Sequence, residues 1–194
     1  MTKEEYINKK LELYRKITHI DEFNMEYGTN NKLCKRCGGS CCKNYPCSFS
    51  PYDFIDINNF DYMKRILDTG YFVIDFFTDK EKNIFYIRTR GLQDDGIVIN
   101  HRSLENECVL HKNNKCELDY YSRPTGGALL IPSRRDLGLP FCYNYYTYKV
   151  QLDDWSKFQD IMHEIVSYYQ GKNINVPKVS KIRKLEKIIR KDEI

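Results

Sequence analysis

The amino-acid sequence predicts an α+β fold, in which a small antiparallel sheet and a cysteine–metal knot are flanked by N-terminal and C-terminal helices. Apolar residues recur at helical spacing near both ends of the chain. Two runs rich in β-branched and aromatic residues, joined by a polar turn, lie in the middle of the chain. Five of the eight cysteines fall within residues 34–47, at spacings typical of metal ligands.

Two helix starts stand out in the first third of the chain. Residues 2–20 are expected to form a helix that begins with a capping box of Thr2 and Glu5. Its apolar residues recur at helical spacing: Tyr6, Leu13, Ile17 and Ile20. Ser50 and Pro51 mark the second start, and Asp53 is interpreted there as a capping residue rather than a metal ligand.

Several strands are expected in the middle of the chain. Residues 71–78 and 84–90 form the two strands of the antiparallel sheet, and residues 97–99 form a short buried strand. The segment 108–116 fits a tight hairpin with a cysteine at each end. Residues 126–132 are expected to form an apolar strand.

The C-terminal third is predicted to be mainly helical. Asp153 or Asp154 is expected to cap a helix that ends at Gly171, with an apolar stripe at Trp155, Phe158, Ile161, Met162, Ile165 and Tyr169. We therefore expect one cysteine-cluster domain over residues 1–171, with its core at 34–148. A basic linker and a last helix follow over residues 172–194.

Composition limits the classes of function. The net charge is only +4, and the basic excess lies in residues 172–194, so nucleic-acid binding is disfavoured. No apolar run approaches the roughly 18 residues of a membrane span, and the N-terminus carries no apolar signal region. We therefore predict a cytoplasmic protein, in which clustered cysteines are expected to bind metal rather than form disulfides.

The cysteine spacing is the main functional signal. Cys34 and Cys37 have the two-residue gap that lets two thiolates bind one metal ion. Gly38 and Gly39 follow and allow the backbone to approach the metal closely. The adjacent residues Cys41 and Cys42 are expected to face different ligands or different metals. Cys108, Cys116 and Cys142 would complete the set.

The pattern Cys34-x-x-Cys37-Gly-Gly-x-Cys41-Cys42 resembles the CxxCxxxCC signature of the zinc- or iron-chelating (YkgJ-like) cysteine-cluster family. The segment from Cys108 to Cys116, with Arg123-Pro124 after it, resembles the second part of that signature. The resemblance covers about residues 34–142. It implies a metal centre, and it extends to the cluster region of flagellin lysine methylases, which carry an iron–sulfur cluster.

The chain departs from this family pattern at one ligand. The Arg-Pro pair stands one residue late, and Gly126-Gly127-Ala128 replaces the cysteine that the family carries after it. Within the resemblance, Cys142 is the candidate replacement. Arg123 matches the family's arginine and is expected either to hydrogen-bond the cluster or to be a solvated surface residue.

Two further residues near the cysteines are candidates. His111 could bind zinc through its imidazole, but a partly exposed turn histidine is the favoured interpretation. Cys47 follows a proline and is either a ligand or a spare thiol with a redox role.

Three functions are compatible with these residues. We favour a metal-binding protein that holds an iron–sulfur cluster and acts in redox or metal-dependent chemistry. Its substrate is unknown and would be a small molecule or a peptide. The alternative is a structural zinc domain that binds a protein or nucleic-acid partner. A nucleic-acid module that works through the basic tail is the weakest of the three. The sequence shows no pattern of catalytic residues that would name a reaction.

Overall fold

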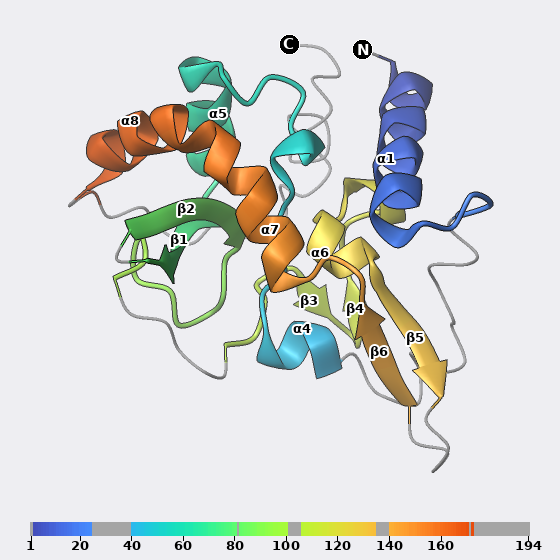
Figure 1. Cartoon of the computed structure of the whole chain (residues 1–194). Coiled ribbons are helices and arrows are strands. Elements are labelled where there is room, and N and C mark those ends of the chain that lie inside the picture. Colours follow the sequence, from blue (N-terminus) through green and yellow to red (C-terminus); the bar gives the residue numbers. More distant parts are fainter. Residues whose placement is uncertain are drawn as a thin grey trace.

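A computed structural model describes residues 2–24, 40–80, 82–100, 106–134, 140–170 and 172. Within these residues the protein mixes helices with three separate two-stranded antiparallel sheets, which confirms the α+β class (Figure 1). The expected basic helix at the C-terminus lies outside the described residues, as do Cys34 and Cys37. No described helix is long and apolar enough to cross a membrane.

Helix α1 (Lys3–Thr18) begins with the predicted capping box of Thr2 and Glu5. Tyr6 is buried as predicted, but the rest of the buried face differs, because it consists of residues four apart: Tyr6, Lys10, Tyr14 and Thr18. Leu13 and Ile17 are only partly buried at the side of this face. The burial of Lys10 is the unexpected feature, since lysine is almost never fully buried without a partner.

The largest sheet pairs β1 (Phe72–Asp79) with β2 (Lys82–Thr89), close to the predicted strands. Phe72 lies opposite Thr89, so the end of β2 is adjacent to the start of β1. The expected strand at 97–99 forms a single parallel bridge from Val98 to Ile74 instead of a full strand.

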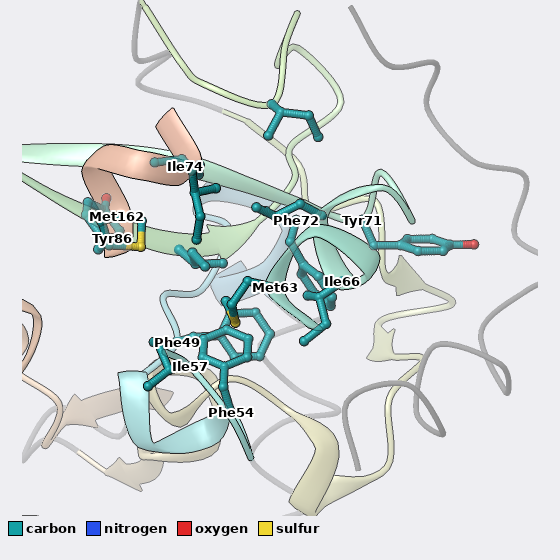
Figure 2. Packing of buried hydrophobic residues seen from close by; sticks show 14 of the residues in the cluster. Phe49, Phe54, Ile57, Met63, Ile66, Tyr71, Phe72, Ile74, Tyr86 and Met162 are labelled. Atoms are coloured by element: carbon teal, nitrogen blue, oxygen red, sulfur yellow. The ribbon is translucent and has the colours of Figure 1, made fainter. Parts of the chain in front are cut away.

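Helices cover this sheet. The contacts on it come from α5 (Phe60–Leu67), α7 (Tyr148–Trp155) and α8 (Gln159–Tyr169). Figure 2 shows the resulting core, in which Phe49 lies beside Phe54, with ring centroids 5.2 Å apart. The Trp155 indole donates to the carbonyl of Phe49 at 2.8 Å, which ties α7 to the chain segment that follows Cys47.

The predicted capping of the helix near Trp155 is wrong. Helix α7 begins at Tyr148 with Thr147 as its cap, because the Thr147 hydroxyl accepts from Val150 N. Asp154 lies inside α7, and its carboxylate accepts hydrogen bonds from Ser50 and Tyr146 instead. The predicted apolar stripe is confirmed for Trp155 and for the α8 residues Ile161, Met162, Ile165 and Tyr169, which are all buried.

The segment after Arg123 is also different from the prediction. Thr125–Ala128 forms a short helix, α6, and the strand begins only afterwards. Strand β5 (Leu130–Arg134) then pairs with β6 (Pro140–Asn144), which carries Cys142 opposite Pro132. The two glycines in α6 let the backbone lie close to the segment at Cys47 and Ser48, where side chains would collide.

Candidate metal centre

The backbone at the end of β2 is bonded to two other segments of the chain, and each of these segments carries a cysteine. The amide of Thr89 donates to the carbonyl of Cys47 at 3.0 Å, and its hydroxyl donates to the same carbonyl at 3.4 Å. Cys108 forms an antiparallel bridge with Gly91, and Val109 N donates to Arg90 O at 3.0 Å. Cys47 and Cys108 are therefore both held by the residues that end this strand, although 60 residues separate them in the chain.

The predicted hairpin after Cys108 is present. Strands β3 (His111–Lys112) and β4 (Lys115–Cys116) pair across a turn at Asn113 and Asn114, which both have positive φ. His111 stands directly opposite Cys116, and its amide donates to the carbonyl of Cys108 at 2.9 Å. The hairpin thus pairs Cys116 with His111, whose backbone is hydrogen-bonded to Cys108.

Cys47 also lies against the glycines of α6. Gly126 N donates to Ser48 O at 2.9 Å. A Cβ atom at Gly127 would lie only 3.1 Å from the Sγ atom of Cys47. The segment where the family resemblance expects a cysteine therefore faces a sulfur that comes from another part of the chain.

The adjacent cysteines Cys41 and Cys42 lie on helix α4 (Ser40–Asn44). The last residue of α4, Asn44, accepts a hydrogen bond at its carbonyl from Asn106 N, two residues before Cys108. The backbone that carries these two cysteines is therefore joined to the backbone that leads into Cys108. Their side chains, and Cys34 and Cys37 altogether, lie outside the part of the chain that is described.

The remaining predicted site residues, Cys142 and Arg123, lie on other segments of the chain. Cys142 is partly buried on β6. The Arg123 guanidinium donates to Leu118 O at 3.4 Å and lies over the Tyr120 ring, 5.7 Å from its centroid. The Arg123 carbonyl accepts from the buried Lys10, so this residue links α1 to the segment before α6.

A buried polar network supports the end of β2, and sequence reasoning did not find it. The Arg88 guanidinium donates to both carboxylate oxygens of Asp94, at 2.7 and 2.9 Å, and to Asp75 at 2.7 Å. Asp94 also accepts from Gly91 N at 2.6 Å and from the Asn106 amide at 2.9 Å. These bonds join the end of β2 to residues 91–94 and to Asn106.

A second buried network positions α6. The Asp53 carboxylate caps Ser50 N as predicted, and it also accepts from the amide and hydroxyl of Thr125, at 2.9 and 2.6 Å. The Lys10 ammonium forms a fully buried ion pair with the same carboxylate. The only sequence signal for this network was the acidic residue at a capping position.

The environment of Cys108 is apolar. Burial raises the pKa of the Cys108 thiol to about 11, and hydrogen bonding from the Thr89 side chain opposes that rise. The four cysteine side chains that are described are present as thiols rather than disulfides. Without a bound metal ion, the Cys108 thiol is therefore protonated at neutral pH.

The described residues do not by themselves form a complete metal site. They include no group of three or more His, Cys, Asp or Glu side chains arranged to hold a metal ion. Two observations nevertheless fit a thiolate centre: the close approach of Gly127 to the Cys47 sulfur, and a buried imidazole nitrogen of His111 that has no hydrogen-bond partner within the described part of the chain. Comparisons of the chain with protein-family models, curated proteins and solved structures found no match.

Proposed function

We propose that this protein is a cysteine-cluster protein that holds an iron–sulfur cluster and acts in redox or metal-dependent chemistry. The observation that carries the proposal is the attachment of Cys47 and Cys108 to the same strand end, with Cys116 on the adjoining hairpin. Cys41 and Cys42 sit on a helix joined to that segment. Cys34 and Cys37 complete the set by their spacing.

The role of each part follows from its position. The cysteine thiolates would bind the metal, and the Arg88–Asp94 network would hold the Cys108 segment in place behind them. The cluster, when bound, supplies electron transfer or an open iron for a substrate. Cys47 is included as a ligand because its sulfur lies beside Gly127, in the segment where the family resemblance expects a cysteine. Cys142 remains a proposed ligand, and Arg123 a proposed hydrogen-bond donor to the cluster.

Structural zinc is the second candidate. It is favoured by the small size of the sheets, since β3 and β4 are two residues long and the sheets do not join within the described residues. Short, separate sheets of this kind are stabilised when thiolates from several of them bind one metal ion. A zinc site with four protein ligands is closed, so function would then lie in binding a protein or peptide partner.

Purification without oxygen, followed by metal and sulfide analysis and a visible spectrum, tests the proposal. An iron–sulfur protein is brown and contains iron and acid-labile sulfide, with about four irons in a cubane cluster. A colourless protein with stoichiometric zinc would support the structural candidate. A colourless protein that takes up neither metal after anaerobic reconstitution would contradict both.

A further inference from the structure

His111 has the surroundings of a metal-binding histidine. Its side chain is only 4% exposed, although the residue as a whole is partly exposed, as expected for its turn position. The Nδ1 atom lies 2.7 Å from Oε1 of Glu107. The other ring nitrogen, Nε2, is buried and has no hydrogen-bond partner among the described residues. Buried polar atoms are nearly always hydrogen-bonded, so this nitrogen calls for an explanation.

The position of the ring relates it to the cysteines. His111 and Cys116 are directly opposite each other in the β3–β4 pair. Side chains at such positions project from the same face of a hairpin, with Cβ atoms about 4.5–5.5 Å apart. The backbone of His111 is also bonded to Cys108, so the imidazole belongs to the same small unit as two proposed thiolate ligands.

We infer that Nε2 of His111 is a ligand of the metal centre and that Glu107 is its positioning residue. In a metal-bound histidine, the nitrogen that does not bind the metal typically donates its proton to a carboxylate or carbonyl, which fixes the tautomer. The contact between Nδ1 and Glu107 has this form, and it leaves a lone pair on Nε2. The inference rests on the proposed function, because the other ligands would be the clustered cysteines.

The chemical consequence is a mixed sulfur and nitrogen ligand set. Replacing thiolate by imidazole removes negative charge from the centre, and it raises the reduction potential of an iron–sulfur cluster. In a zinc site it gives a Cys₃His set, which is a known structural arrangement. The inference is therefore independent of which metal is bound.

X-ray absorption at the metal edge tests the inference on the full-length protein, purified or reconstituted without oxygen. Wild-type protein is expected to show imidazole scattering with a nitrogen at about 2.0–2.1 Å beside sulfur at about 2.3 Å. His111→Ala should lose the imidazole contribution, and His111→Cys should convert it to sulfur while retaining the metal. Circular dichroism of each variant checks that the chain has folded.

Two further pairs of variants complete the test. Glu107→Ala should weaken metal binding by roughly 10–100-fold, and Glu107→Gln, whose carbonyl can still accept from Nδ1, should retain most of it. His163→Ala and Glu164→Ala, at exposed positions on α8, are the controls and should leave the spectrum unchanged. A metal-loaded wild-type protein with sulfur ligands alone, or with imidazole scattering that survives His111→Ala, overturns this inference but not the proposed function. A wild-type protein that binds no metal overturns both.

Discussion

The Cβ atom that a larger residue at position 127 would carry lies 3.1 Å from the Sγ atom of Cys47. A side chain at position 127 would therefore lie in close contact with the Cys47 sulfur. The family resemblance expects a cysteine in the 126–128 segment, and this chain has Cys47 beside it instead. We therefore predict that Cys47 supplies the ligand that the family resemblance expects in the 126–128 segment.

Removing a residue that only hydrogen-bonds to a metal ligand typically weakens metal binding by roughly 10–100-fold. Cys47→Ala removes a proposed ligand itself, so it should weaken metal binding by more than that. The double variant Cys47→Ala/Gly127→Cys should regain metal, because the new side chain enters the space that the old sulfur leaves. Metal per chain and the visible spectrum are the measurements, with Tyr45→Ala, at an exposed position, as the control. Unchanged metal binding in Cys47→Ala would show that Cys47 is not a ligand.

Asp94→Ala should destabilise the fold strongly. The substitution leaves the buried Arg88 guanidinium without its bidentate partner and also removes the acceptor for Gly91 N. Breaking a buried pair from one side costs about 3–5 kcal/mol. Asp95→Ala, at the exposed neighbouring position, should change the free energy of unfolding by no more than about 0.5 kcal/mol. Equal denaturant midpoints for the two variants would contradict this role of Asp94.

Lys10→Met should also be destabilising, even though methionine suits a buried position. It leaves the Asp53 carboxylate buried without its counter-charge, at a cost of about 3–5 kcal/mol. Lys16→Met, at an exposed position on the same helix, should have little effect. Urea unfolding monitored by circular dichroism compares the two, and a stable Lys10→Met protein would argue against the buried ion pair.

The free energy of unfolding should depend on pH through the Asp154 carboxyl. Burial raises the pKa of this carboxyl, while Lys157 and hydrogen bonds from Ser50 and Tyr146 oppose the rise. The native state thus takes up a proton before the unfolded state does, so this group favours folding more as the pH falls from neutral through its native pKa.

Asp154→Asn removes that titration. The variant should therefore gain stability relative to wild type at neutral pH, and the gain should shrink as the pH falls toward the carboxyl pKa of the unfolded chain. Thermal unfolding at a series of pH values measures the difference. A difference that stays constant with pH, or grows in acid, would show that the Asp154 pKa is not raised.

Local patterns in the sequence were sufficient to predict several of the structural elements. The capping residues Thr2 and Ser50 were identified because a cap depends on residues within one turn. The paired strands and the Cys108–Cys116 hairpin were predicted from alternation and a polar turn. By contrast, α6 was predicted as strand, because its two glycines carry no helical signal and its position depends on Asp53 and Ser48.

The candidate site depended on contacts between residues far apart in the chain. The ion-pair partners of Lys10 and Asp94, and the glycine beside the Cys47 sulfur, lie at least six residues away in the chain, so no spacing rule reveals them. His111 was interpreted as a turn residue because the cysteine spacing already offered enough sulfur ligands, whereas the burial of its side chain results from packing and its orientation from Glu107. The cysteine spacing led to the proposed ligand set, but it did not predict how the described cysteine segments are joined.

Native mass spectrometry of the protein purified without oxygen tests the central claim most directly. The account predicts an excess mass over the 23.2 kDa chain that corresponds to one iron–sulfur cluster, and this excess should be lost on oxidation. An excess equal to zinc would move the account to the structural candidate. A mass equal to the bare chain, unchanged after anaerobic incubation with iron and sulfide or with zinc, would contradict the claim that these cysteines form a metal centre.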